Sequence, residues 1–170
     1  NHIKDRPMKY FTTFATAAVL AMTAIPAFAE DVIRHKIPDS DFPILQAVEV
    51  PAGKTTVYLS GTVPAAINAD ADKNSVAAYG TMEEQTVSVM NRIKAQLEGM
   101  GMSVGDIIKM QAFLVAPEGE AVDFKGFMAG YTQFFGTKEQ PNLPVRSAMV
   151  VDKLVNPGWL VELEVTAVKP

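Results

Sequence analysis

Hydrophobic and polar positions along the chain predict a domain that mixes strands with two helices. The clearer helix begins at Thr81, because Thr81 and Glu84 form a capping-box pair and apolar residues then recur at helical spacing. A second helix is predicted after Pro117, where aromatic residues recur at helical spacing over 124–135. Packing in a core or against another subunit is the plainer interpretation of this aromatic stripe, and a binding box for an aromatic ligand is the alternative.

Several segments carry the β-branched or alternating pattern of strands. They are residues 43–50, 55–60, 107–115, 147–151 and 159–168. We expect the first two of these to pair with each other, and residues 64–80 to form a long surface loop. The predicted order is β-β-α-β-α-β-β, an α+β fold in which both helices cover one face of a mixed sheet.

The first 29 residues have the form of an export signal. Lys9 supplies a positive head, residues 11–25 are apolar and uncharged, and Ala27-Phe28-Ala29 has the small-x-small form of a cleavage site. A transmembrane anchor is the alternative, but this run is shorter than the roughly 20 apolar residues that cross a bilayer. We therefore expect cleavage after Ala29 and a periplasmic or secreted protein, with no membrane partner once the signal is removed.

The chain after the signal reads as a polar lead-in over 30–42 followed by one domain over 43–170. It keeps 12 of the 15 Lys and Arg residues and 18 of the 19 Asp and Glu residues, which gives a formal net charge of −6. An acidic balance argues against a phosphate backbone as partner, so no nucleic acid is expected.

Candidate chemistry is narrowed further by the residues that are missing. The chain has no cysteine, and His35, expected to be a flexible surface residue, is the only histidine after the signal. Thiolate nucleophiles, zinc–thiolate sites and Ser-His-Asp triads therefore have no basis here. Neither a metal nor a cofactor is predicted, and any reaction must use Arg, Glu, Ser, Tyr, backbone groups and water.

Two C-terminal segments resemble the signature of the RidA (YjgF) family of reactive imine and enamine deaminases. They are the run 142–147, NLPVRS, and the strand 161–165, VELEV. Upstream, residues 59–61 (LSG), 104–109 (VGDIIK) and the YxxFF pattern that begins at Tyr131 are similar to the family's other landmarks, and the likeness covers about residues 43–168. The resemblance implies a chorismate-mutase-like fold and a homotrimer with ligand sites in clefts between subunits.

The resemblance also implies roles for individual residues. Arg146 matches the arginine that holds the substrate carboxylate, and a planar guanidinium suits that task because it offers two parallel hydrogen bonds. Glu162 matches a glutamate beside a bound water, where a carboxyl could move protons during imine hydrolysis. Ser60, Gly61 and Tyr131 match positions that line the cleft. Without the resemblance, Arg146 would read as a surface ion-pair partner and Glu162 as part of a solvated strand face.

Two positions depart from the best-characterised deaminases of the family. Ile44 stands where they carry a tyrosine, and Met128 stands where they carry an asparagine. Hydrolysis of 2-imino or enamine acids to 2-keto acids and ammonia is the favoured function, and a non-catalytic trimer that binds small carboxylates is the alternative. Cleavage of RNA is a third possibility, which the acidic charge and the lack of a catalytic histidine disfavour.

Overall fold

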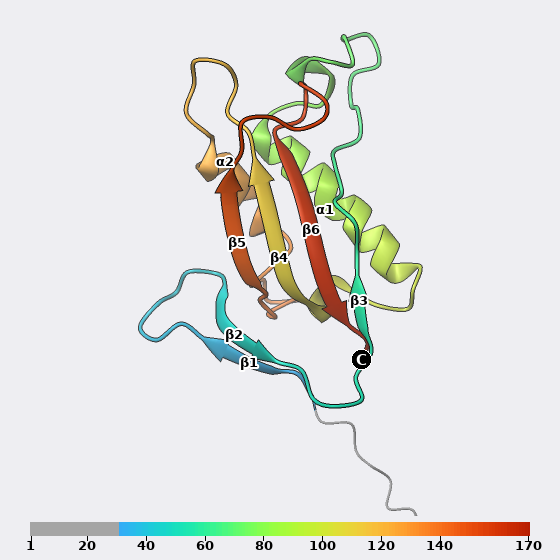
Figure 1. The fold of residues 1–170 in the computed structure, drawn as a ribbon, viewed down its shortest axis with the longest axis vertical. Helices are drawn as coiled ribbons and strands as arrows, with labels where there is room; N and C mark the ends of the chain where they lie inside the picture. The colour runs from blue at the N-terminus through green and yellow to red at the C-terminus, as the bar shows by residue number, and fades with distance from the viewer. Residues whose placement is uncertain (1–30) are drawn as a thin grey trace, which may run out of the picture.

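A computed structural model of the chain describes residues 31–170 (Figure 1). The export signal predicted for residues 1–29 lies outside these residues. Within 31–170, no helix is long and apolar enough to cross a membrane.

The main sheet has four strands in the order β3-β6-β4-β5. These are β3 (Thr56–Tyr58), β4 (Ile107–Leu114), β5 (Val145–Val150) and β6 (Val161–Val168). Strands β4 and β5 are parallel, whereas β6 runs antiparallel to both β3 and β4. Helices α1 (Met82–Glu98) and α2 (Phe124–Tyr131) lie side by side on one face of this sheet (Figure 1). The predicted α+β class, with two helices on a mixed sheet, is confirmed.

Local sequence explains where the two helices begin. The hydroxyl of Thr81 accepts a hydrogen bond from the Glu84 backbone N–H, and the Glu84 carboxylate accepts one from the Thr81 N–H, as the capping box predicts. Asp123 caps α2 in a similar way, because its carboxylate accepts a hydrogen bond from the Gly126 N–H. Both caps satisfy backbone donors that have no partner within the first helical turn.

The hydrophobic core lies between the sheet and the two helices. Alternate residues of β6 point into it and are buried, namely Val161, Leu163, Val165 and Ala167. Helix α1 contributes Val89, Met90, Ile93 and Leu97, all fully buried, and α2 contributes Phe127 and Tyr131. The other face of the sheet carries polar and half-buried side chains, so the two faces differ as the alternation of β6 indicates.

The N-terminal strands differ from the prediction. Strand β1 (Ile33–Lys36) pairs with β2 (Leu45–Glu49) in a separate two-stranded antiparallel sheet. The predicted pairing of segment 43–50 with segment 55–60 is therefore wrong, because β2 has β1 as its partner and β3 pairs with β6. Strand β1 was not predicted, since its sequence is polar and charged.

Side-chain bonds explain why this polar segment forms a strand. His35, expected to be flexible, lies in β1 and shares a hydrogen bond of 2.6 Å with the carboxylate of Glu49 on β2. Arg34 reaches from β1 to backbone carbonyl oxygens at the start of β4 and before β5. Cross-strand pairs of this kind stabilise a strand whose hydrophobic pattern alone does not predict it.

The segments between the helices and strands agree largely with the prediction. Residues 64–80 form the predicted loop, with a short 3-10 helix at its end, Val76–Ala78. Another 3-10 helix, Val104–Asp106, leads into β4. Helix α2 ends at Tyr131, earlier than the aromatic stripe, but the stripe continues into the turn that follows, because the rings of Tyr131 and Phe135 stack with centroids 4.7 Å apart.

Candidate functional site

Arg146 lies in strand β5 on the face of the sheet that the helices cover. It is paired in register with Met110 of β4, whose side chain is fully buried in the core. Four aromatic rings surround its guanidinium carbon. The ring centroids lie 4.4 Å away for Tyr131, 5.1 Å for Phe127, 5.6 Å for Phe42 and 6.0 Å for Phe124. Rings at these distances stabilise a cation through their negative faces.

The charge of Arg146 has no acidic partner among the described residues. The ion pairs found within 31–170 are His35 with Glu49 and Lys94 with Glu98. The guanidinium donates one hydrogen bond of 3.3 Å to the thioether sulfur of Met128, a weak acceptor. Burial lowers the pKa of Arg146, so folding places this cation in a poorly solvated position. A half-buried guanidinium without a counter-ion is suited to bind an anion.

Tyr131 forms the floor beneath this guanidinium. Its side chain is fully buried, and burial raises the pKa of its hydroxyl. The hydroxyl donates a hydrogen bond of 2.8 Å to the carbonyl oxygen of Pro43. The structure therefore places the predicted cleft residue Tyr131 behind Arg146, where its ring contacts the guanidinium and its hydroxyl is already engaged.

Glu162 lies on the opposite face of the sheet. It belongs to the polar set of β6 and is paired in register with Phe113 of β4. Its carboxylate lies directly against the backbone of Gly61, in the space that a side chain at position 61 would fill. Gly61 is held there by the bridge between Thr62 and Leu163. The absence of a Cβ at Gly61 thus permits this close approach.

The five predicted site residues form two groups in a single chain. One group, Arg146 with Tyr131, lies between β5 and α2. The other group contains Glu162, Gly61 and the neighbouring exposed Ser60, and it lies on the open face of the sheet. Because side chains on opposite faces of a sheet cannot meet, one chain does not bring Arg146 and Glu162 together.

Several residues around Arg146 were not assigned to the site from the sequence. The aromatic stripe of the second helix supplies Phe124 and Phe127, which pack on the guanidinium as well as on the core. Met128 also contacts Arg146, whereas Ile44, the other departure from the family pattern, packs against the core. No sequence pattern pointed to Phe42 as a site residue, because it lies in a loop and reaches Arg146 only through the tertiary fold.

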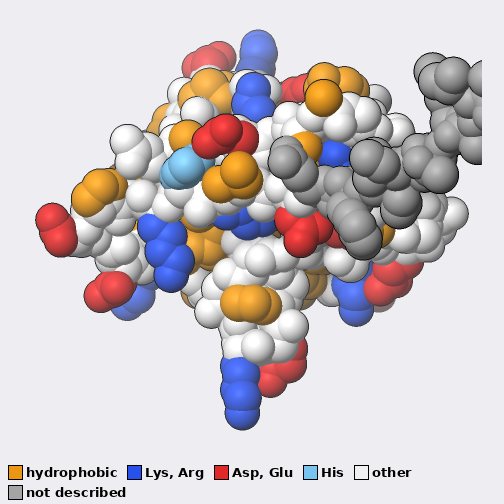
Figure 2. Space-filling view, turned by 90° about the horizontal axis from the view of Figure 1, so that it is seen from below, with side chains coloured by type: hydrophobic (Ala, Val, Ile, Leu, Met, Phe, Trp, Pro, Cys, Tyr) orange, Lys and Arg blue, Asp and Glu red, His pale blue; other side chains and the backbone are white. Residues whose placement is uncertain are grey.

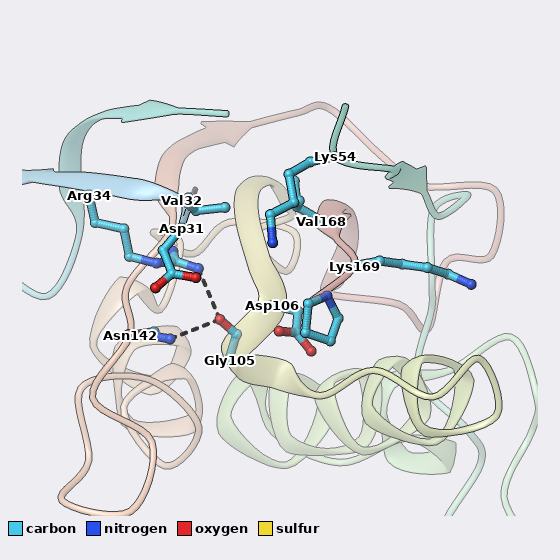
Figure 3. Close-up of a pocket in the computed structure, with 10 residues that line it drawn as sticks. Asp31, Val32, Arg34, Lys54, Gly105, Asp106, Asn142, Val168 and Lys169 are labelled. Carbon is cyan, nitrogen blue, oxygen red and sulfur yellow. Dashed lines mark hydrogen bonds between the residues drawn. The ribbon is translucent and has the colours of Figure 1, made fainter. Parts of the chain in front are cut away.

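A separate cavity of about 340 Å³ lies beside the β1 strand (Figure 3). Arg34 and Asn142 both donate hydrogen bonds to the carbonyl oxygen of Gly105, at 2.9 Å and 3.1 Å. Arg34 also donates to the carbonyl oxygens of Ile107 and Leu143, at 3.1 Å and 2.6 Å. These bonds tie the segment before Arg146 to the start of β4. The cavity is lined by cations and carboxylates alike, namely Arg34, Lys54, Lys169, Asp31 and Asp106.

On the face seen in Figure 2, charged side chains do not gather into a single patch. Figure 2, which views the end of the molecule that carries β1 and β2, shows acidic and basic side chains interspersed over the visible face. Among residues 31–170, no three His, Asp or Glu side chains come together in a way that could hold a metal ion.

Comparisons with known proteins point to one family. The sequence model of the family described as Endoribonuclease L-PSP matches residues 31–169. A RutC family protein from Saccharolobus solfataricus is 30% identical over 82% of this chain and 98% of its own length. TdcF from Escherichia coli, whose name assigns it provisionally as a reactive intermediate deaminase, is 29% identical over 79% of this chain and 93% of its own.

Solved structures give the same result for the fold. A Rid family protein from Yersinia pestis superposes with a TM-score of 0.61 at 22% identity, covering 81% of this chain and 98% of that one. The crystal structure of Escherichia coli TdcF with bound serine superposes with a TM-score of 0.55 at 27% identity, covering 81% and 93%. These structural neighbours have the chorismate-mutase-like fold that the family resemblance implied.

Proposed function

This chain belongs to the Endoribonuclease L-PSP family, which includes the RutC and YjgF/Rid proteins, and from that membership we propose that it hydrolyses reactive 2-imino or enamine acids. The products are a 2-keto acid and ammonia. The observation that carries this proposal is the guanidinium of Arg146, which is half-buried among aromatic rings with no carboxylate partner within residues 31–170. A substrate carboxylate supplies the missing counter-ion.

Arg146 acts as the carboxylate anchor. Its planar fork can donate two parallel hydrogen bonds to a carboxylate, and both are charge-assisted. The aromatic floor of Tyr131 and Phe127 fixes the plane of the fork from behind. The relative TdcF has been solved with bound serine, an amino acid that also carries a carboxylate, which supports an anchor of this kind.

Glu162 is the residue we assign to proton transfer. Its carboxylate accepts a proton from a water molecule while the water oxygen bonds to the carbon of the C=N group, and the carboxyl then gives that proton to the nitrogen. The resulting carbinolamine then loses ammonia as the C–N bond breaks and the C=O bond forms. A positioned carboxyl can move these protons between oxygen and nitrogen. Gly61 leaves the space in which the carboxylate lies, and Ser60 borders it.

A complete site requires more than one chain, because Arg146 and Glu162 lie on opposite faces of the sheet. We assign it to the interface of a homotrimer, with the anchor from one subunit and the glutamate from its neighbour. The open sheet face, which carries Glu162, is the surface that such packing would cover. Light scattering should then give three times the chain mass, and a stable monomer at micromolar concentration would contradict the assembly.

An assay of ammonia and keto-acid release tests the reaction directly. Imines are generated in situ by an amino-acid oxidase, and the rate with the protein is compared with the rate in buffer alone. Arg146→Lys keeps the charge but loses the planar fork, so we expect it to weaken binding on the order of tenfold. Glu162→Gln keeps the shape of the side chain and should reduce turnover while sparing keto-acid affinity. A rate equal to the buffer background overturns the proposal.

Mixed oligomers test whether the site lies between subunits. Arg146→Ala is expected to lose substrate binding and Glu162→Gln to turn over slowly, since every site then lacks one residue. When the two variants are co-expressed, some interfaces receive an intact Arg146 from one chain and an intact Glu162 from the other. Partial recovery of activity is the expected result. A site within one chain would give no recovery, because every chain carries one defect.

A non-catalytic role is the second candidate, favoured by the departures at Ile44 and Met128. Met128 contacts Arg146 where the deaminases carry an amide, so one polar group of the cleft is replaced by a thioether. In that case the protein is a trimer that binds small carboxylates through Arg146. Saturable keto-acid binding without rate enhancement would support this role. The interspersed charges of Figure 2 offer no basic stripe for RNA on the visible face, so ribonuclease activity is not proposed.

We also propose that the protein is exported. The pattern of residues 9–29 predicts removal of the signal after Ala29 and release into the periplasm or the medium. Mass spectrometry of protein from the native envelope should find Glu30 at the N-terminus. Retention of residues 11–25 in a membrane fraction would contradict this expectation.

A further inference from the structure

The surroundings of Arg146 restrict what the rest of a bound molecule can be. Aromatic rings and a thioether lie next to the guanidinium within residues 31–170. They are the rings of Phe42, Phe124, Phe127 and Tyr131 and the sulfur of Met128. A carboxylate on Arg146 therefore brings its neighbouring atoms into contact with hydrocarbon and sulfur.

Two of the four rings are accessible from outside. Phe42 and Phe124 keep 43% and 39% of their surface exposed, although both are large hydrophobic side chains. Phe127 and Tyr131 are fully buried and form the floor. The exposed rings lie 5.6 Å and 6.0 Å from the guanidinium carbon, and we call these two rings the walls of the candidate site.

Within one subunit, the polar groups beside these walls are already engaged, and the Glu162 carboxylate that a neighbouring subunit would add repels a second carboxylate. The Tyr131 hydroxyl donates its hydrogen bond to the carbonyl oxygen of Pro43. The Met128 sulfur is occupied by the guanidinium and is a weak acceptor in any case. A hydroxyl or a second carboxylate placed against these walls would lose its hydration without gaining a hydrogen bond.

We propose that this site selects 2-imino and 2-keto acids whose substituent is apolar and bulky, aromatic above all, over those with a small or charged substituent. The inference rests on the proposed carboxylate anchor and adds the substrate class to it. An aromatic substituent can lie against Phe42 or Phe124 in the offset or edge-on arrangements that rings favour. It also removes the exposed surface of these rings from water.

Calorimetry with three unreactive probes tests the selectivity. Phenylpyruvate, pyruvate and oxaloacetate share the 2-keto acid group and differ in carrying an aromatic, a methyl or a charged substituent. We expect phenylpyruvate to bind at least tenfold more tightly than pyruvate, since a single methylene in an apolar pocket already changes affinity by roughly tenfold or more. Oxaloacetate should bind most weakly. Equal affinities, or a preference for oxaloacetate, overturn the inference.

Variants of the two exposed rings test whether these rings cause the selectivity for an aromatic substituent. Phe42→Ala and Phe124→Ala should each reduce the ratio of phenylpyruvate to pyruvate affinity, whereas Val155→Ala, which trims an apolar side chain that is 93% exposed elsewhere, should leave the ratio unchanged. Met128→Asn should shift preference toward oxaloacetate by restoring a hydrogen-bonding group. If the wall variants keep the full ratio, the selectivity does not come from these rings and the inference fails.

The same measurements separate this inference from the anchor on which it rests. Arg146→Ala should abolish the binding of all three probes. If the parent binds them equally and Arg146→Ala abolishes that binding, the anchor stands and only the selectivity is wrong. If Arg146→Ala binds phenylpyruvate as well as the parent does, both the anchor and the proposed function are wrong.

Discussion

The hydroxyl of Tyr131 in α2 donates a hydrogen bond of 2.8 Å to the carbonyl oxygen of Pro43, two residues before the start of β2. This bond ties the N-terminal hairpin to the helix that lies over Arg146. Phe42, next to Pro43, is one of the rings around the guanidinium. A single buried phenol therefore supports the candidate site in two ways, as the ring beneath the cation and as the tether of the neighbouring segment.

Replacement of Tyr131 by Phe separates these two contributions. The ring remains beneath Arg146, while the hydrogen bond to Pro43 is lost. We expect the free energy of unfolding to fall by about 1 kcal/mol, the usual net contribution of one intramolecular hydrogen bond. Keto-acid affinity should fall less than in Arg146→Ala. Urea denaturation and calorimetry measure the two effects, and an unchanged stability would show that the tether contributes nothing.

Gln85 is buried in α1 and connects three backbone groups. Its amide nitrogen donates to the carbonyl oxygens of Gly80 and Gly158, both at 3.0 Å, and its amide oxygen accepts from the Leu160 N–H at 2.8 Å. Gln85→Leu leaves these groups without partners, so we expect the free energy of unfolding to fall by about 3 kcal/mol or more. The control is Gln96→Leu, at an exposed position of the same helix. Equal denaturation midpoints for the two variants would contradict the prediction.

Gly130 lets the two helices approach each other closely. A Cβ atom at this position would lie 2.7 Å from the Thr86 Cβ and 3.0 Å from the Glu83 carbonyl oxygen, both in α1. Gly130→Ala should therefore lower the free energy of unfolding by about 1–3 kcal/mol through overpacking. Gly99→Ala is the matched control, because its added methyl meets nothing closer than 3.5 Å. Thermal melts of the two variants provide the comparison.

Gly61→Ala tests the placement of the Glu162 carboxylate. The new methyl group needs the space that the carboxylate now fills, so the flexible Glu162 side chain must move while the fold is retained. Displacement of a catalytic group by about 1 Å lowers rates by as much as a hundredfold, so we expect turnover to fall by tenfold or more. Gly99→Ala again serves as the control. Turnover equal to that of the parent protein would argue against a catalytic role for Glu162 at this place.

The regular part of the fold could be predicted because local chemistry determines it. Thr81 and Glu84 form a cap within one turn of chain, and β6 alternates buried and polar residues regardless of what lies around it. Strand β1 could not be predicted, because Arg34 is satisfied by carbonyl oxygens of β4 and of the segment before β5, which are remote in sequence. A polar strand stabilised by remote partners leaves no periodic signal.

The candidate site, like the fold, could be predicted only in part. Arg146 and Glu162 were identified through short motifs that resemble a family, but their positions on opposite faces of the sheet follow from strand register. The alternation along β6 places Glu162 on its polar face, whereas no such pattern marks Arg146, whose neighbours in β5 are half-buried or exposed. The contact between the Phe42 ring and Arg146 depends on the tertiary fold alone.

Arg34 and Arg146 are two partly buried arginines with contrasting hydrogen-bond partners. Burial lowers the pKa of both, so each guanidinium is partly removed from water. Arg34 donates hydrogen bonds to the carbonyl oxygens of Gly105, Ile107 and Leu143. Arg146 donates a hydrogen bond to the sulfur of Met128 and lies against aromatic rings. Folding therefore satisfies the first cation and leaves the second without a strong acceptor among the residues that the structure describes.

Leucine substitutions at these two arginines should have contrasting effects on the stability of the fold. Arg34→Leu removes the hydrogen bonds that the guanidinium donates to three carbonyl groups, of which that of Gly105 keeps a second donor, Asn142, so we expect the free energy of unfolding to fall by more than about 2 kcal/mol. Arg146→Leu removes a poorly solvated charge and loses only cation–ring attraction, so its stability should stay within about 1 kcal/mol of the parent or exceed it. Keto-acid binding should nevertheless vanish in Arg146→Leu.

Guanidinium chloride denaturation with and without phenylpyruvate measures both stability and binding. The ligand should stabilise the parent protein and have no effect on Arg146→Leu. A loss of stability in Arg146→Leu as large as in Arg34→Leu would mean that Arg146 supports the fold rather than a ligand.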